Sequence, residues 1–407
     1  MSERERRRLI VEHLRAGRAE DAAQELARSS ELYPGDDVLH HVIGIAFASR
    51  GTLPAARAEL ETAATFNPES AAILADLSQV RLAQGEPDKA IESAERSLVL
   101  DPDLPIARFA LGRACFAGEC ERQARHNPPP EAGQRVSLID GRTPSYLRAV
   151  TEMEAALNAE PPFAHAVRSA LASAYLWSGH YHAAEGQLRV LLAELPSGPE
   201  AERVRGRWLE AKYEMERERY WAIDEAELAR IQRSAAEPEA SAETKLRLAH
   251  AYAALGREEA LVGALADAHA AGYRPRQALI SRSTREERLC EAVSDVHVLL
   301  AGGLECIIDE QFRVVPFGHL NAAVFGEARS WRSARLDFAW GAQMDVLVPS
   351  LYRFSLRSPS ELVRSGRFTQ FSYDPGEVRF AHAVGSRNLM AKEGVIPFAD
   401  IETIRFQ

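Results

Sequence analysis

Residues 37–70 read DVLHHVIGIAFASRGTLPAARAELETAATFNPES, and residues 71–104 read AAILADLSQVRLAQGEPDKAIESAERSLVLDPDL, so both stretches are 34 residues long. Three columns of residues recur at the same interval from the start of the chain: Gly17, Gly51 and Gly85; Ala22, Ala56 and Ala90; Pro34, Pro68 and Pro102. Gly permits a tight turn between paired helices, Ala lets the helices approach closely, and Pro ends the second helix. A fixed period of this length predicts a stack of helix-turn-helix units, an α-solenoid.

The units resemble the tetratricopeptide repeat, which has small residues at fixed positions of both helices and Pro near its end. Further units are expected over 106–161 and 175–196, with an inserted, Pro-rich loop at about 119–143. The charged run at about 200–234 is expected to continue the stack as amphipathic helices with solvated charges. A last helix is expected to run from Arg285 to Leu300.

In repeats of this kind, the first helix of each pair lines a concave groove. The positions concerned are filled here by Val38, His41, Ile45, Gln79, Leu82, Phe109, Arg113 and Phe116. This mostly apolar lining predicts a groove for an amphipathic helix or apolar segment of another protein. The alternative is that residues such as Leu82, Phe109 and Phe116 only pack between repeats.

Composition limits the function classes. A net charge of −10 over 407 residues argues against a nucleic-acid partner. The four cysteines, Cys115, Cys120, Cys290 and Cys306, lack the spacing of a disulfide framework or a zinc site, so free thiols are expected. No apolar stretch approaches the length of a membrane helix, and the charged N-terminus is unlike a signal peptide, so we expect a cytoplasmic protein without membrane contact.

After Gly302 and Gly303 the helical period stops, and short β-like runs separated by turn signals begin. These runs start at Cys306, Phe312, Ala334, Asp345, Val378, Gly394 and Glu402. The expected fold is therefore α+β with two domains. Residues 1–300 form the solenoid, and residues 301–407 form a small, mostly antiparallel β-rich domain.

Two segments of the second region are alike, since Val315-Pro316-Phe317 and Ile396-Pro397-Phe398 both place Pro-Phe directly after a predicted strand. Proline cannot donate to a sheet ladder, so each Pro is expected to end its strand in a turn that buries Phe. In order and spacing, these and other short motifs resemble the ImpE family across about residues 303–407. The residues that carry the resemblance are Pro316, Phe317, Trp331, Arg335, Pro349, Tyr352, Gly366, Arg367, Gly385, Arg387 and Pro397.

The resemblance implies an accessory role in a bacterial type VI secretion system, where family members are associated with the contractile sheath, its small subunit or the ATPase that recycles it. It implies no catalysis. The motif arginines, Arg335, Arg367 and Arg387, could bind an acidic partner or pair with local carboxylates such as Asp337 and Asp345.

No cluster of residues forms a catalytic, metal-binding or phosphate-binding motif, so we expect neither enzyme activity nor a cofactor. The expected function is a protein-interaction scaffold that docks a sheath or ATPase component. Two alternatives stay open: a repeat-containing regulator or chaperone unconnected with secretion, and a catalytic or ligand-binding C-terminal domain governed by the repeats.

Overall fold

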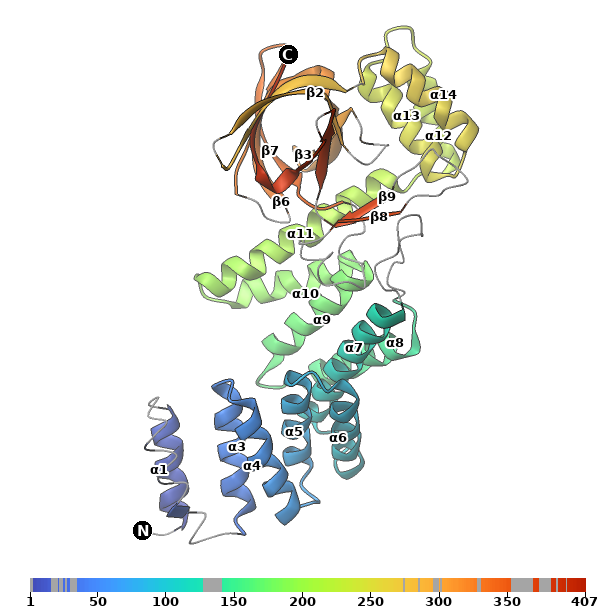
Figure 1. Cartoon of the computed structure of the whole chain (residues 1–407). Helices are drawn as coiled ribbons and strands as arrows, with labels where there is room; N and C mark the ends of the chain where they lie inside the picture. Colours follow the sequence, from blue (N-terminus) through green and yellow to red (C-terminus); the bar gives the residue numbers. More distant parts are fainter. Residues whose placement is uncertain are drawn as a thin grey trace. The chain divides into compact units, whose positions relative to one another are not determined.

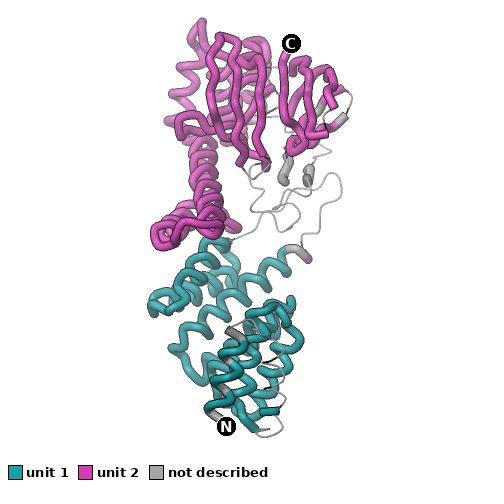
Figure 2. The backbone as a smooth tube through the Cα atoms, turned by 90° about the vertical axis from the view of Figure 1, so that its left-hand side faces the viewer, with its two compact units in different colours: residues 1–123, 140–174 teal, residues 124–139, 175–407 magenta. Residues whose placement is uncertain are grey.

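A computed structural model describes residues 3–15, 21, 25, 28–29, 35–126, 141–273, 275–284, 286–295, 300, 302–327, 331–352, 369–372, 382–385, 387–392 and 394–407. The chain divides into two compact units (Figure 2). The first comprises residues 1–123 and 140–174, and the second comprises residues 124–139 and 175–407.

The first unit is helical (Figure 1). Its helices are α1 (Glu3–Arg15), α3 (Asp37–Ser49), α4 (Leu53–Phe66), α5 (Ala71–Ala83), α6 (Pro87–Leu100), α8 (Pro144–Asn158) and the greater parts of α7 (Pro105–His126) and α9 (Ala164–Ser178). Helices α3 and α4 pack together, as do α5 and α6, which confirms the predicted helix pairs. The loop expected at 119–143 is wrong in its first part, because α7 continues to His126; residues 127–140 lie outside the described part of the chain.

The small-residue columns have the geometry that the repeat requires. Gly51 and Gly85, in the turns between paired helices, have φ of 76° and 78°, a left-handed conformation that favours glycine. A Cβ added at Gly112 of α7 would lie 2.6 Å from Met153 Cγ and 2.8 Å from the carbonyl oxygen of Ala149, both on α8. These helices touch so closely that only glycine fits at this position.

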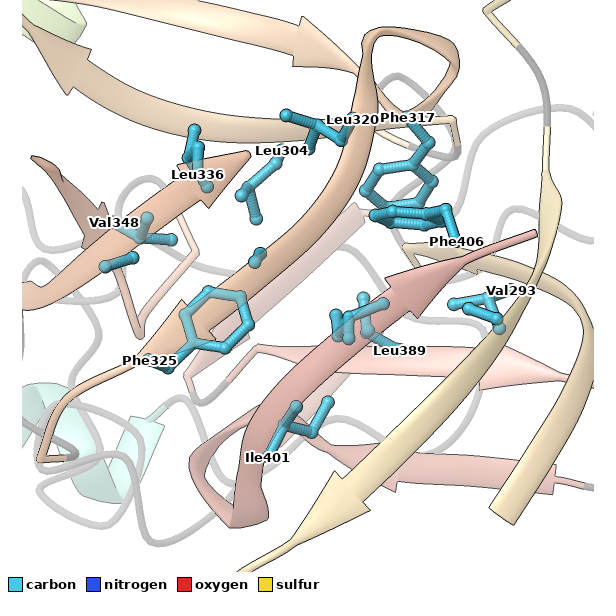
Figure 3. Close-up of a cluster of buried hydrophobic side chains, with 14 of the residues drawn as sticks. Val293, Leu304, Phe317, Leu320, Phe325, Leu336, Val348, Leu389, Ile401 and Phe406 are labelled. Atoms are coloured by element: carbon cyan, nitrogen blue, oxygen red, sulfur yellow. The ribbon is translucent and has the colours of Figure 1, made fainter. Parts of the chain in front are cut away.

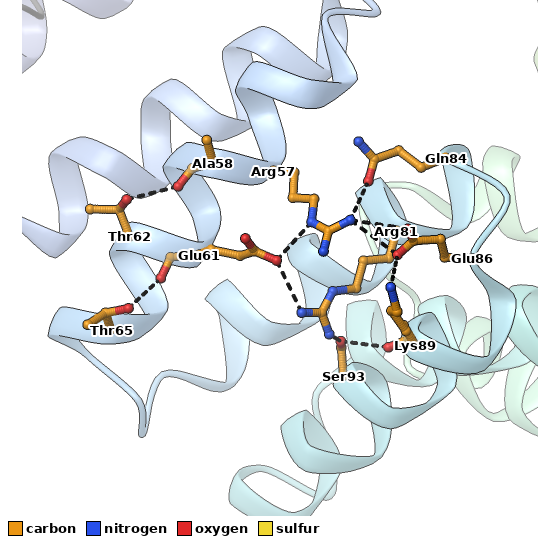
Figure 4. Close-up of polar contacts among 10 residues, drawn as sticks. All are labelled: Arg57, Ala58, Glu61, Thr62, Thr65, Arg81, Gln84, Glu86, Lys89 and Ser93. Carbon is orange, nitrogen blue, oxygen red and sulfur yellow. Dashed lines mark hydrogen bonds and ion pairs between the residues drawn. The ribbon is translucent and has the colours of Figure 1, made fainter.

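A polar network connects two successive repeats (Figure 4). Glu61 of α4 accepts hydrogen bonds from Arg57 Nε at 2.8 Å and from Arg81 Nη2 of α5 at 3.3 Å. Arg57 also reaches Glu86, which precedes α6, at 3.2 Å, and Arg81 donates to Ser93 Oγ of α6 at 2.7 Å. Helices α4, α5 and α6 of neighbouring repeats are thereby joined by charged hydrogen bonds in addition to their apolar contacts.

The second unit begins with further helices. These are α10 (Tyr181–Glu194), α11 (Pro199–Trp221), α12 (Glu225–Ala235), α13 (Ala242–Ala254) and α14 (Glu258–Ala270). Gly179 and Gly256 stand in their inter-helix turns with φ of 81° and 67°. The expectation of solvated charges over 200–234 is wrong for Glu214 and Arg217 of α11, which are 5% and 0% exposed.

Ten strands of the described chain form one curled sheet with antiparallel neighbours (Figure 1). They are β1 (Arg276–Arg282), β2 (Glu287–Asp295), β3 (Gly303–Ile308), β4 (Gln311–Pro316), β5 (Leu320–Phe325), β6 (Trp331–Phe338), β7 (Gln343–Pro349), β10 (Asn388–Ala391), β11 (Gly394–Pro397) and β12 (Ile401–Phe406). Their order is β11-β10-β2-β1-β12-β5-β6-β7-β3-β4. Strands β8 (Thr369–Ser372) and β9 (His382–Gly385) pair separately.

The helix expected over 285–300 is wrong, because β2 occupies residues 287–295. Strand β1, still earlier in the chain, pairs with β12, more than one hundred residues away, as in the pair Ala278 and Phe406. Such long-range pairing overrides local helix propensity. The sheet therefore takes in residues from Arg276 onward, ahead of the domain boundary expected at residue 300.

Strand alternation fills the inside of the curled sheet with apolar side chains. Along β6, for example, Ala334, Leu336 and Phe338 are buried, whereas Ser333 and Arg335 are exposed. Figure 3 shows this inner core, to which nearly every strand of the main sheet contributes.

A second core lies between the helices and the outer face of the sheet. Strand β3 is buried along almost its whole length, because Leu304 and Cys306 belong to the inner core while Ile307 packs in a cluster with Tyr213 of α11 and Leu246 of α13. Phe312 and Val314 of β4 join the same cluster. Helices α11 and α13 therefore complete the β-rich region and are part of its packing.

Candidate functional site

One face of helix α3 carries two exposed apolar residues on either side of a half-buried histidine, and we call this face the α3 stripe. Val38, His41 and Ile45 follow one another at intervals of three and four residues, so they share one face of the helix. Val38 and Ile45 are 43% and 44% exposed. In the middle of the stripe, His41 Nε2 lies 2.8 Å from Asp76 Oδ2 of α5, and Gln79 donates to Asp76 Oδ1 at 3.2 Å.

The residues predicted on α7 have a different environment. Phe109 is 5% exposed and stacks on Phe163, with ring centroids 5.7 Å apart. Phe109 therefore packs against the turn that precedes α9, which agrees with the alternative of packing between repeats. Phe116, like Leu82 of α5, is partly buried. Arg113 places its guanidinium carbon 5.5 Å from the centre of the Phe109 ring.

We call the eight predicted groove residues the first-helix surface: Val38, His41, Ile45, Gln79, Leu82, Phe109, Arg113 and Phe116. All eight lie in the first unit on α3, α5 and α7, the first helices of three successive pairs. Their exposed apolar area is on α3, and their single cation is on α7.

In the β-rich unit, the repeated Pro-Phe motif marks two equivalent corners. Pro316 ends β4 and Pro397 ends β11, and a short 3-10 helix follows each strand, η2 (Phe317–His319) and η4 (Phe398–Asp400). Phe317 and Phe398 are 1% and 0% exposed. The predicted turn that buries Phe is confirmed at both corners.

The motif arginines separate into two kinds. Arg335 is exposed on β6, and its Nε donates to Asp345 Oδ1 of β7 at 2.9 Å, so the predicted pairing with a local carboxylate is confirmed for this residue. Arg387 is fully buried and donates to Asp295 Oδ2 at 2.6 Å. Gly366 and Arg367 lie outside the described residues.

Most other motif residues are structural. Pro349 is buried at the end of β7, Gly385 ends β9, and Trp331 begins β6 beside the ring of Tyr213. The hydroxyl of Tyr352 donates to the carbonyl oxygen of Asn388 and accepts from its N–H, both at 3.1 Å. Burial, reinforced by Asp295, raises the pKa of Tyr352, so the phenol stays neutral.

Five charged side chains meet between α11 and the sheet, and we call them the junction cluster: Glu214, Arg217, Asp295, Glu305 and Arg387. Arg217 donates to Glu214 at 3.0 Å and to Glu305 at 2.7 Å. Arg387 pairs with Asp295 at 2.6 Å and reaches Glu305 at 3.8 Å. None of the five is more than 5% exposed.

Arg217 joins the helix to the sheet. Besides its two carboxylates, it donates to the carbonyl oxygen of Leu351 at 3.0 Å, and its guanidinium carbon lies 5.5 Å from the Trp331 ring and 5.9 Å from the Phe312 ring. Burial alone would lower the pKa of Arg217, but the carboxylates more than offset that effect and the pKa is raised. The side chain therefore stays charged inside the protein.

Little in the sequence indicates this cluster. Glu214 and Arg217 stand in a run of charged residues that is typical of a solvated helix, and only the neighbouring aromatics Tyr213, Tyr220 and Trp221 indicate a buried face. Glu305 lies in a strand whose burial on both sides follows from the helices above it.

The junction cluster does not have the features of a catalytic centre. Its carboxylates accept hydrogen bonds from guanidinium groups and contact almost no solvent, so they lack the access that a general acid or base needs. Among the described residues, no group of three or more His, Cys, Asp or Glu side chains is placed to hold a metal ion. No helix in the described ranges has the length and apolarity to cross a membrane.

A family model matches the greater part of the β-rich region. Residues 287–405 match the ImpE protein family. The ImpE match begins at β2 and ends in β12, so it contains both Pro-Phe corners and three members of the junction cluster, Asp295, Glu305 and Arg387. It leaves out β1 and α11, although both pack into the same region.

No curated protein sequence matches the chain. Similar solved structures include protein VPA1032 from Vibrio parahaemolyticus, at 13% identity, 89% coverage of this chain, 97% coverage of that chain and a TM-score of 0.29. A tetratricopeptide repeat protein from Parabacteroides merdae has 16% identity, with 67% of this chain and 93% of that one covered and a TM-score of 0.36. TTC0263, a thermophilic TPR protein of Thermus thermophilus, has 18% identity, with 52% of this chain and 98% of that one covered and a TM-score of 0.37.

Proposed function

We propose that the protein is a non-catalytic interaction scaffold that holds an apolar helical segment of another protein on its first-helix surface. The observation that carries this proposal is the stripe on α3, where Val38 and Ile45 keep 43% and 44% of their surface exposed. Helix repeats typically bind partners on the extended surface that their first helices form. An amphipathic helix can bury such a stripe with its own apolar face.

The proposed partner is a component of a type VI secretion system, either a sheath subunit or the ATPase that recycles the sheath. The ImpE match at residues 287–405 supports this assignment, because the family resemblance implies an accessory role in such a system. The β-rich region would then dock on the same machinery as the repeats.

Binding of the purified full chain to the small sheath subunit and to the ATPase tests the proposal, with isothermal titration calorimetry as the measurement. Val38→Asp with Ile45→Asp places charges in the stripe and should weaken binding at least tenfold. Val99→Asp is the control, because Val99 is 82% exposed on α6, a second helix of its pair.

Equal affinity of the stripe variant, the control and the unaltered chain would contradict the proposed surface. Lack of binding to either component would contradict the secretion assignment and favour a regulator or chaperone unconnected with secretion.

A further inference from the structure

Arg113 is the one basic residue of α7 between Arg108 and Arg122, and its surroundings are apolar. It lies over the ring of Phe109, which stacks on Phe163, and Phe116 follows three residues later on the same helix. No carboxylate in the described part of the chain pairs with Arg113, and burial, the one cause that acts on it, lowers its pKa. The guanidinium nevertheless keeps its charge, because the pKa of an arginine side chain lies far above neutral pH.

Two other arginines of α7 have carboxylate partners of the kind that Arg113 lacks among the described residues. Arg108 donates to Glu152 at 3.1 Å, and Arg122 donates to Glu119 at 2.9 Å. Buried or partly buried charges are normally paired in this way, because loss of hydration is costly. Arg113 is desolvated by its neighbours yet stays partly exposed, so a partner can reach its side chain.

We infer that Arg113 binds a side-chain carboxylate of the partner segment, so that this segment carries Asp or Glu next to an apolar residue. The inference rests on the proposed function, since it places the carboxylate in the segment that covers the first-helix surface. A guanidinium forms bidentate hydrogen bonds with a carboxylate, and the flat ring of Phe109 holds it in place from one side. The adjacent apolar residue would contact Phe116.

The expected strength follows from the chemistry of the pair. A charged hydrogen bond in a partly desolvated site contributes about 1.5–3 kcal/mol, which corresponds to a change in affinity of about 10-fold to 100-fold. The contribution should fall as salt rises, because Arg113 is not wholly removed from solvent.

Selection of peptides against the full chain tests the inference without knowledge of the natural partner. A phage library of random peptides about as long as one repeat helix is panned, and enriched peptides are synthesised with amidated C termini, so that a terminal carboxylate cannot contribute. Fluorescence polarisation then measures each peptide and its Glu→Gln or Asp→Asn form against the unaltered chain and Arg113→Gln. We expect acidic residues to be enriched beside apolar ones, and Arg113→Gln to weaken the acidic peptide about tenfold or more.

A double-mutant cycle shows whether Arg113 and the acidic residue of the peptide interact directly. The Gln form of the peptide should bind the unaltered chain and Arg113→Gln equally, which is the signature of a direct interaction in a double-mutant cycle. Arg113→Glu should favour a peptide whose acidic residue is replaced by Arg. Arg96→Glu is the matched control, because Arg96 is exposed on α6 and the substitution changes the net charge by the same amount.

Additive effects in the cycle, or failure to enrich any peptide that depends on Arg113, would overturn the inference. Ile45→Asp distinguishes this failure from failure of the proposed function. Peptides that lose affinity with Ile45→Asp but not with Arg113→Gln would support binding to the apolar surface and contradict the proposed contact between Arg113 and a carboxylate. Peptides that lose affinity with Arg113→Gln but not with Ile45→Asp would support the contact with Arg113 and show that the α3 stripe is not part of the binding site.

Discussion

Two arginines of one strand show how the environment decides what a residue does. Arg332 and Arg335 are three positions apart on β6, so they face opposite sides of the sheet. Arg332 points into the core, where it is 3% exposed and donates to the carbonyl oxygens of Gly326, Phe398 and Ile401. Arg335 points outward and pairs with Asp345. One arginine fixes backbone corners inside the sheet, whereas the other stays on the surface.

Gly112→Ala should destabilise the first unit by about 1–3 kcal/mol, because the added Cβ would overlap Met153 and the backbone of Ala149. Thermal unfolding followed by far-ultraviolet circular dichroism measures the effect. Gly118→Ala, on the same helix, is the control, since its Cβ would meet nothing closer than 3.7 Å. That substitution should stabilise the helix by about 1 kcal/mol. A stabilised Gly112→Ala variant would contradict the close contact between α7 and α8.

Arg217→Met should destabilise the second unit by about 3–5 kcal/mol, because Glu214 and Glu305 would stay buried without the hydrogen bonds of Arg217. Tryptophan fluorescence during urea unfolding reports this unit alone. All five tryptophans of the chain, Trp177, Trp208, Trp221, Trp331 and Trp340, belong to it.

Arg335→Met is the control for this experiment, because the exposed pair with Asp345 should contribute little to stability. Similar losses of stability in both variants would show that burial of the Arg217 pairs does not matter.

At the scale of elements, the helix pairs are held together by apolar contacts and by charged bridges between repeats. Glu61 is the centre of one such bridge, between Arg57 and Arg81. Burial acts to raise the pKa of Glu61, but hydrogen bonds from both arginines outweigh it and the pKa is lowered. A carboxyl with a lowered pKa stabilises the fold above its ordinary value of 4.5, and this contribution is lost as pH falls through the lowered value.

Glu61→Gln should therefore lower the melting temperature of the first unit at neutral pH, and the difference from the unaltered chain should shrink in acid. The effect should be small, because the Glu61 side chain is 42% exposed. Melting curves by circular dichroism at about pH 7 and about pH 4 provide the measurement. Glu69→Gln, at an exposed carboxylate after α4, is the control for the loss of one carboxylate from the surface. A constant difference between Glu61→Gln and the unaltered chain would contradict the role of ionised Glu61.

At the scale of the whole molecule, helices and strands of the second unit pack around a common core. Helices α11 and α13 cover the outer face of β3 and β4, and Arg217 supplies a buried cation to Glu305. We therefore expect the last strands to depend on these helices for folding. This packing gives the ImpE-like region a helical partner from its own chain.

A fragment of residues 181–407 should fold, whereas a fragment of residues 276–407 should not, although it keeps every strand that the structure describes. Without α11, the shorter fragment exposes Ile307 and Phe312 and leaves Glu305 without Arg217. Size-exclusion chromatography and thermal melting of both fragments measure the difference. A cooperative melt and a monomeric profile for residues 276–407 would contradict the dependence on α11.

Local patterns in the sequence are sufficient to predict the repeats and most of the later strands. Gly51, Gly85 and the Ala and Pro columns act through backbone and packing requirements that recur in every unit, so their spacing alone predicts helix pairs. The Pro-Phe corners at Phe317 and Phe398 are local in the same sense. On the first-helix surface, the 34-residue period predicted which residues are candidates for contact with a partner.

Contacts between distant segments select which strands join the sheet and which charges are buried. Strand β1 has its partner β12 at the other end of the region, and local signals favoured a helix where β2 lies. Arg217 is 88 positions from Glu305, and Arg387 is 92 positions from Asp295. Burial of an ion pair depends on groups brought together by the tertiary structure, whereas helix periodicity depends on neighbours only a few residues away.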